Sequence, residues 1–301
     1  MPAPRLLIVL ASAVVLSGCL GSAPEALLAA PSLDAAPDHF APGWPELAQA
    51  RVRPGVHHGF AAPAVAGVLE VREEFSDCTG NFIFRSPDNR SLYLGTAAHR
   101  VDAMGLGEPF VIDRSAASGT LWYSAWHTLA AMGVTDSAAF DANEFALIRI
   151  DDEHPSLVHP AALHSGVADP ASVERGAPVV AFGNSDLRRG PEELDRHEGF
   201  VSRPGRENSV LYMRGPIVPG DSGSPAPLAS GEALGVLVRL GTLDEFKRGN
   251  IVTTNLAPSL GFARENEGVE VELATWPLLE APVATQACAA LPLLPEPPAA
   301  G

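Results

Sequence analysis

The residues best suited to chemistry lie in a glycine-flanked turn, where residues 219–225 read Pro-Gly-Asp-Ser-Gly-Ser-Pro. Gly220 and Gly223 can adopt backbone angles that other residues avoid, so the turn can present the hydroxyl of Ser222 outward. We predict that the N–H groups of Gly220 and Ser222 converge to form an oxyanion hole. The same residue types also build ordinary surface turns, so Ser222 needs a nearby base to act as a nucleophile.

A candidate base, His99, follows an apolar run and a set of small residues, because residues 91–98 read Ser-Leu-Tyr-Leu-Gly-Thr-Ala-Ala. A third segment reads Glu-Phe-Ala-Leu-Ile over residues 144–148 and is an apolar run that opens on a carboxylate. Ser222 and His99 therefore have the residue types of a nucleophile and a base.

These three segments together resemble the motifs of the trypsin-like (chymotrypsin-fold) serine peptidases, here Thr-Ala-Ala-His at 96–99 and Gly-Asp-Ser-Gly at 220–223. The order histidine, acid, serine also matches that family, whereas subtilisins and α/β-hydrolases use other orders. The resemblance implies an all-β fold of two six-stranded antiparallel β-barrels, with the active site in the cleft between them. It further implies a serine endopeptidase, a hydrolase that forms an acyl-enzyme on Ser222 without a cofactor or a metal.

Two positions depart from the family pattern. The family has aspartate where Glu144 stands, so one additional methylene must be accommodated if the carboxylate is to orient His99, and Asp141 is the alternative acid. Ser224 replaces the second glycine of the family motif, a minor change. Two other functions stay open: a catalytically impaired peptidase-fold binding module (a pseudoprotease), and an esterase that uses the same triad.

The resemblance also indicates which residues would select the substrate. Pro216 lies six residues before Ser222, near the base of the family's specificity pocket, where trypsins carry an acid. We therefore do not expect cleavage after Lys or Arg. Val238 and Arg239 are predicted for the opposite wall, where an inward Arg239 would favour an acidic substrate side chain and a solvent-facing one would leave the pocket apolar.

The elements that must position these groups read as short strands separated by turn signals, which is typical of an all-β domain. We assign the peptidase domain to residues 51–280, a length sufficient for a sizeable core. The predicted strands cover residues 67–71, 81–85, 91–96, 109–114, 120–126, 144–150, 177–184, 197–203, 209–215, 233–240 and 250–255. We expect residues 86–90 to form a hairpin turn that leads to His99, and residues 257–267 to form a short helix.

The amino-terminal segment predicts export. Arg5 precedes an apolar run from Leu6 to Leu16 that is too short to span a bilayer, as in a signal peptide. Residues 16–19 read Leu-Ser-Gly-Cys and resemble a prokaryotic lipobox, which implies a lipoprotein signal peptide over residues 1–19 and lipidation at Cys19. The protein would then be lipid-anchored to the cell membrane on its extracytoplasmic side, with secretion as the alternative.

Two Ala/Pro-rich segments flank the domain, a linker over residues 20–50 and a tail over residues 281–301. Lipidation at Cys19 would leave Cys78 and Cys288, which we expect to form a disulfide in an oxidising compartment.

The chain is acidic, with 36 Asp and Glu against 20 Lys and Arg and a net charge of −16, which excludes a nucleic-acid partner. The expected partner is a protein or peptide substrate, with membrane contact only through the lipid at Cys19. A histidine-rich stretch, with a histidine at every fifth position from His154 to His164, predicts no metal site because no regular element gathers such side chains on one face.

Overall fold

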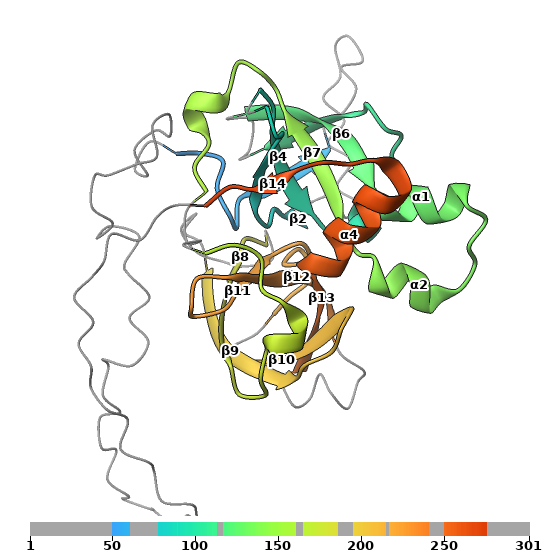
Figure 1. The fold of residues 1–301 in the computed structure, drawn as a ribbon. Coiled ribbons are helices and arrows are strands. Elements are labelled where there is room, and N and C mark those ends of the chain that lie inside the picture. The colour runs from blue at the N-terminus through green and yellow to red at the C-terminus, as the bar shows by residue number, and fades with distance from the viewer. Residues whose placement is uncertain are drawn as a thin grey trace, which may run out of the picture.

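Two antiparallel β-sheets form two lobes that lie against each other, with a helix along their junction (Figure 1). The computed structural model describes residues 50–60, 78–88, 90–112, 117–160, 165–185, 195–214, 217–240 and 250–275. The predicted signal peptide, Cys19, most of the linker, the strand at 67–71, Cys288 and the tail lie outside these residues. No helix within the described ranges is long and apolar enough to cross a membrane.

The first sheet has eight strands. They are β1 (His57–Phe60), β2 (Cys78–Thr79), β3 (Ile83–Arg85), β4 (Leu92–Thr96), β5 (Pro109–Ile112), β6 (Ala117–Ser124), β7 (Ala146–Ile150) and β14 (Glu272–Leu273). Their order in the sheet is β14-β3-β4-β7-β6-β5-β1-β2. Because β2 and β3 are close in the chain but lie near opposite ends of this order, the sheet curls and its ends approach each other. Two very short strands, β2 and β14, make this sheet larger than the six strands expected.

The second sheet has six strands. They are β8 (Pro178–Gly183), β9 (Asp195–Arg203), β10 (Asn208–Arg214), β11 (Pro225–Pro227), β12 (Ala233–Leu240) and β13 (Asn250–Asn255). Their order is β11-β12-β13-β10-β9-β8. An antiparallel bridge between Val179 and Leu228 joins β8 to the residue that follows β11, so the two ends of this sheet meet. The prediction of an all-β protein with two antiparallel sheets is confirmed.

The predicted short helix is present as α4 (Leu256–Glu267), which ends at Gly268 with a left-handed φ of 63°. Two further helices, α1 (Ala125–Ala131) and α2 (Ser137–Ala142), were not predicted. Both are short, so their apolar spacing is too brief to distinguish a helix from a loop or a strand end. The side chain of Asp136 caps α2 by accepting the N–H of Ala138 at 3.0 Å.

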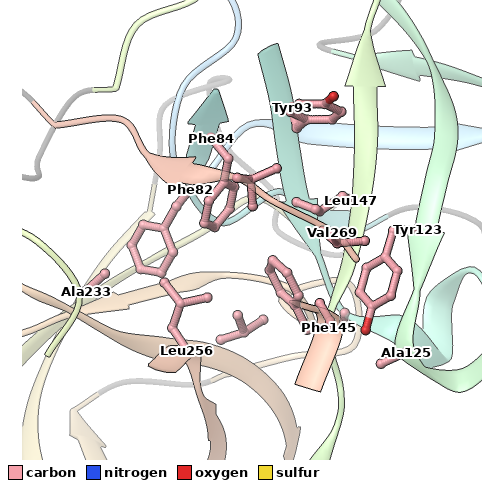
Figure 2. Close-up of a cluster of buried hydrophobic side chains, with 14 of the residues drawn as sticks. Phe82, Phe84, Tyr93, Tyr123, Ala125, Phe145, Leu147, Ala233, Leu256 and Val269 are labelled. Atoms are coloured by element: carbon pink, nitrogen blue, oxygen red, sulfur yellow. The ribbon is translucent and has the colours of Figure 1, made fainter. Parts of the chain in front are cut away.

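Three apolar cores hold the molecule together. Each sheet encloses its own cluster of buried side chains. A third cluster lies between the sheets and is drawn in Figure 2, with Phe82, Phe84, Phe145 and Leu147 from the first lobe and Val236, Val238, Leu256 and Ala263 from the second lobe and α4. Because this third core is continuous, the two lobes and α4 pack as one body.

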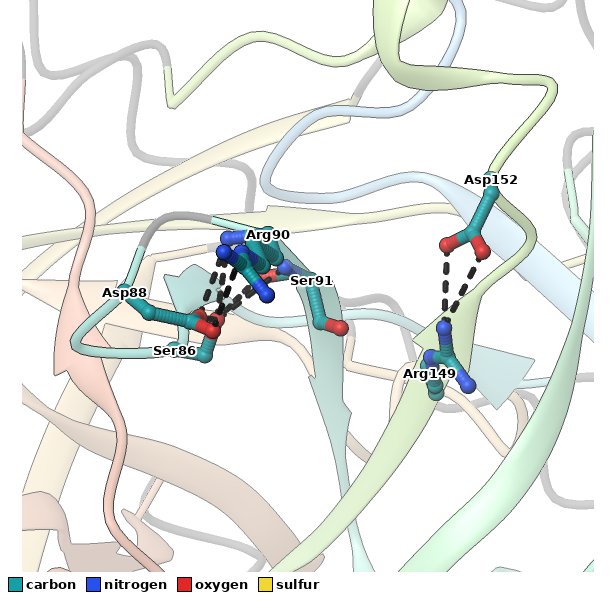
Figure 3. Close-up of polar contacts among 6 residues, drawn as sticks. All are labelled: Ser86, Asp88, Arg90, Ser91, Arg149 and Asp152. Carbon is teal, nitrogen blue, oxygen red and sulfur yellow. Dashed lines mark hydrogen bonds and ion pairs between the residues drawn. The ribbon is translucent and has the colours of Figure 1, made fainter.

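The hairpin that leads to His99 is present as predicted, with β3 paired to β4 through Ile83 opposite Leu94. Ser86 organises its turn, because the hydroxyl donates to Asp88 Oδ1 at 2.5 Å and accepts the N–H of Ser91 at 3.0 Å (Figure 3). The hydrogen bond from Ser86 lowers the pKa of the Asp88 carboxyl. Figure 3 also shows the ion pair between Arg149 and Asp152, 3.0 Å long, at the end of β7.

Candidate active site

The register between two neighbouring strands brings the candidate base and acid together. β4 and β7 are antiparallel with Thr96 opposite Ala146, so the end of β4 lies beside the start of β7. His99 follows β4 in a short 3-10 turn, η4 (Ala98–Arg100), and Glu144 lies two residues before the start of β7. Two residues far apart in the chain therefore meet where these two inner strands of the first sheet end and begin.

One carboxylate oxygen of Glu144 holds His99 at two points. Oε2 accepts the backbone N–H of His99 at 2.9 Å and lies 3.0 Å from Nδ1 of its ring. The side chain of Glu144 is 8% exposed and that of His99 is 24% exposed. Because a carboxylate can only accept hydrogen bonds, Nδ1 carries the hydrogen and Nε2 keeps its lone pair. An imidazole in this tautomer can take a proton from a hydroxyl group.

Helix α1 lies beside this imidazole, and α2 is tied to α1. The ring centroid of Trp126 on α1 lies 6.2 Å from that of His99. Trp126 donates its indole N–H to the carbonyl of Phe140 on α2 at 3.1 Å, and the two rings meet edge to face at 5.3 Å. The helices are thus tied to each other beside the segment that carries Glu144.

The structure brings the alternative acid, Asp141, to a different partner. Its Oδ2 lies 3.0 Å from Nη1 of Arg239 on β12, and the side chain of Arg239 is 54% exposed. Val238, the other predicted wall residue, is 4% exposed and packs in the core between the sheets. Pro216 lies outside the described residues.

The turn that carries Ser222 has the backbone of a glycine-dependent loop, with φ of 98° at Gly220 and 93° at Gly223. A Cβ atom added to Gly223 would lie 2.0 Å from the carbonyl oxygen of Thr79 and 3.1 Å from Oγ1 of Thr96. The turn therefore packs directly on β2 and on the end of β4, the strand that leads to His99.

Backbone hydrogen bonds hold this turn between the two sheets. The N–H of Gly223 donates to the carbonyl of Leu237 on β12 at 2.7 Å, while the N–H of Thr79 on β2 donates to the carbonyl of Ser222 at 3.1 Å. Asp221 is fully buried, and its Oδ2 accepts the N–H of Val218 at 2.9 Å. Ser222 is thus presented at the junction of the lobes, on the side of His99.

The hydrogen bonds of the Ser222 hydroxyl and of two backbone N–H groups bear on whether Ser222 can act as a nucleophile. Among the described residues, the hydroxyl of Ser222 forms no hydrogen bond with His99, and such bonds are commonly long in ligand-free enzymes. Within the same part of the chain, the N–H groups of Gly220 and Ser222 donate to no other group. Both N–H groups remain available to an anionic oxygen.

Cys78 supports the turn from the first sheet. It is a free, fully buried thiol whose Sγ donates to the carbonyl of Ser222 at 2.7 Å, and its expected disulfide partner, Cys288, lies outside the described residues. Burial raises the pKa of this thiol to about 12, with a smaller opposing effect of the charge of Arg100. Cys78 therefore supports the turn as a neutral hydrogen-bond donor.

Two further hydroxyl residues bind the same turn and carry no signal in the sequence. Ser185 and Thr79 donate to the carbonyls of Pro219 and Gly220, respectively. Neither belongs to a motif, because each reaches the turn from a segment that is distant in the chain.

The sequence matches no protein-family model, and no curated protein is significantly similar to it.

Proposed function

We propose that this protein is a serine endopeptidase of the trypsin-like (chymotrypsin-fold) family, with its two curled sheets as the two barrels of that fold. The observation that carries the proposal is the double contact of Glu144 with His99, at 2.9 and 3.0 Å. The glycine turn of Ser222 packs on the strand that leads to this pair. A nucleophile, an oriented base and two available N–H donors support acyl transfer.

In the proposed reaction, His99 Nε2 takes the proton of Ser222 as its Oγ attacks a peptide carbonyl. The N–H groups of Gly220 and Ser222 bind the oxygen that becomes negative, and each such donor lowers the barrier by about 3 kcal/mol. Glu144 stabilises the imidazolium, which then protonates the leaving amine. Water, deprotonated by His99, attacks the acyl-enzyme and releases the second product.

For substrate preference we propose an apolar side chain at the cleaved bond. Arg239 is more than half exposed, and Asp141 neutralises its charge at 3.0 Å. An arginine engaged in this way offers little attraction to an acidic substrate side chain. Of the two alternatives for the pocket, the ion pair supports the apolar one.

We also propose that the enzyme acts outside the cytoplasmic membrane, anchored through a lipid on Cys19. The support is the apolar run from Leu6 to Leu16 and the lipobox-like residues 16–19. Its substrates would then be extracytoplasmic proteins or peptides. Radiolabelled palmitate incorporated into the wild type but not into Cys19→Ala is the expected result, and incorporation into both would contradict the anchor.

A binding module without catalysis is the second candidate function. It is favoured by the missing hydrogen bond between Ser222 and His99 among the described contacts. An esterase that uses the same triad is separated from a peptidase by comparing casein digestion with hydrolysis of short-chain esters.

The deciding experiment is covalent labelling of the full chain by a fluorophosphonate probe. We expect the wild type to be labelled, and His99→Ala and Ser222→Ala to remain unlabelled. Ser202→Ala is the matched control, because Ser202 donates its hydroxyl to the carbonyl of Val210 on the second sheet, outside the candidate site. A folded wild type that does not react would favour the binding module.

A further inference from the structure

The carbonyl groups of the nucleophile turn are all engaged. Ser185 Oγ donates to the carbonyl of Pro219 at 2.5 Å, and Thr79 Oγ1 donates to the carbonyl of Gly220 at 2.9 Å. The next two carbonyls accept from Ser224 N at 3.0 Å and from Thr79 N and Cys78 Sγ at 3.1 and 2.7 Å. Four successive carbonyl oxygens are therefore held by groups around the turn.

These bonds determine where the N–H groups point. In a planar trans peptide the C=O and N–H bonds point in opposite directions, so a fixed carbonyl also fixes the N–H of the following residue. The carbonyl of Pro219 and the N–H of Gly220 belong to one peptide group. Rotation of that group would break the bond from Ser185 and direct a carbonyl oxygen toward the site of the developing anion. Ser185 thus opposes collapse of the oxyanion hole.

Ser185 is built into its position. It is 5% exposed and follows β8, on the second sheet. A Cβ atom on Gly220 would lie 2.6 Å from Ser185 Oγ, so the two residues are in direct contact. The preceding N–H, that of Asn184, donates to Thr79 Oγ1 at 3.1 Å. One network therefore connects the end of β8, strand β2 of the first sheet and the turn.

We propose that Ser185 is a positioning residue for the oxyanion hole, acting through the Pro219–Gly220 peptide, with Thr79 holding the next peptide. The assignment rests on the proposed function and names the side chains that keep its anion site in the productive orientation. Ser185 does not touch the substrate. Its contribution therefore falls on the chemical steps, acylation and deacylation, because the anionic oxygen develops only when Ser222 or water attacks the carbonyl.

Loss of one neutral hydrogen bond changes the equilibrium constant between two orientations of a peptide group by roughly a factor of 5 to 10. We expect Ser185→Ala to lower kcat for p-nitrophenyl acetate by about 5- to 10-fold while KM stays within about twofold. We expect Thr79→Val to have a smaller effect, because the peptide that Thr79 holds carries the N–H of Asp221, which donates to the carbonyl of Val218 and is not an oxyanion donor. Thr79→Ser, which keeps the hydroxyl, is expected to retain most of the wild-type rate.

The experiment compares the full-length wild type with these three variants and with Ser222→Ala and Ser202→Ala. Ser202→Ala removes a partly buried hydrogen bond from a serine hydroxyl to a backbone carbonyl, 3.0 Å long, on the second sheet. Urea unfolding of each variant reports stability, and p-nitrophenyl acetate reports kcat and KM separately. A merely structural role would give Ser185→Ala and Ser202→Ala equal rates at comparable losses of stability.

The outcomes separate the two proposals. A reactive wild type with a lower kcat in Ser185→Ala and Thr79→Val supports the assignment. A reactive wild type with unchanged kcat in both folded variants overturns the assignment and leaves the proposed function standing. A wild type no faster than Ser222→Ala overturns the proposed function and the role of Ser185 with it.

Discussion

Glu144 binds His99 through a single oxygen, Oε2, which lies 2.9 Å from the backbone nitrogen and 3.0 Å from Nδ1 of the same residue. The ring and the backbone of His99 are therefore oriented by one acceptor. Glu144 lies two residues before β7, beside the end of β4, and from there its side chain reaches His99 with the additional methylene of glutamate.

This contact predicts large losses on substitution of Glu144. Glu144→Ala removes the acceptor and is expected to lower kcat by about 10³- to 10⁴-fold. Glu144→Gln keeps the shape of the side chain, but its amide N–H can donate to Nδ1 and hold the ring in the tautomer that cannot accept the serine proton, so a comparable loss is expected. Hydrolysis of p-nitrophenyl acetate measures both variants. A wild-type rate in Glu144→Gln would contradict the orienting role of the carboxylate.

The ion pair between Asp141 and Arg239 predicts a change of substrate preference. Asp141→Asn leaves the charge of Arg239 uncompensated, so cleavage after glutamate should rise relative to cleavage after leucine by about 10-fold in kcat/KM. Chromogenic peptides that differ only at that residue provide the measurement. In the double variant with Arg239→Gln the preference should return to that of the wild type, and a preference that persists there would refute the role of Arg239.

His159 predicts a loss of stability in mild acid. It is fully buried, and burial together with the charge of Arg53 lowers its pKa from 6.5 to about 4. The unfolded chain therefore binds a proton at a higher pH than the folded one. The stability contributed by neutral His159 is complete above pH 6.5 and is lost as the pH falls toward 4, by at most about 3 kcal/mol. Urea unfolding of the wild type and of His159→Gln at pH 7.5 and 4.5 tests this. If the free energy of unfolding fell equally in the two proteins between these pH values, the role of His159 would be contradicted.

Cys78 should resist modification in the folded protein. Its thiol is fully buried and its pKa is raised to about 12, so almost no thiolate exists at pH 8. Iodoacetamide is expected to leave Cys78 unmodified under native conditions and to alkylate it in urea, as read by peptide mass spectrometry. Rapid native alkylation would contradict the buried position.

Phe145 should be among the most costly residues to truncate. It is fully buried between the sheets and meets Phe84 edge to face, with ring centroids 5.5 Å apart. Phe145→Ala is expected to lower the free energy of unfolding by about 3 to 5 kcal/mol. Met132→Ala is the control, since Met132 is 58% exposed and should cost less than about 0.5 kcal/mol. Similar values for the two variants would contradict a shared core between the lobes.

Local pattern was sufficient for much of the fold. The hairpin at residues 86–90, the strands at 91–96 and 233–240 and the helix at 257–267 were all predictable, because turn residues and short apolar runs are signals that lie within a few neighbouring positions. The glycine turn around Ser222 was visible for the same reason. Helices α1 and α2 and strands such as β2 and β11 were not predicted, because they are too short to carry a period of their own.

The contacts among these elements were decided by the tertiary structure. The sequence offers Glu144 as the acid and Asp141 as the alternative. The register of β4 against β7 brings Glu144 to His99, while Asp141 on α2 contacts Arg239. The sequence supplied an even pair of cysteines after Cys19, and only the structure places the thiol of Cys78 against the carbonyl of Ser222. Ser185 reaches the turn because the curl of the sheets joins segments far apart in the chain, and such proximity has no local signature in sequence.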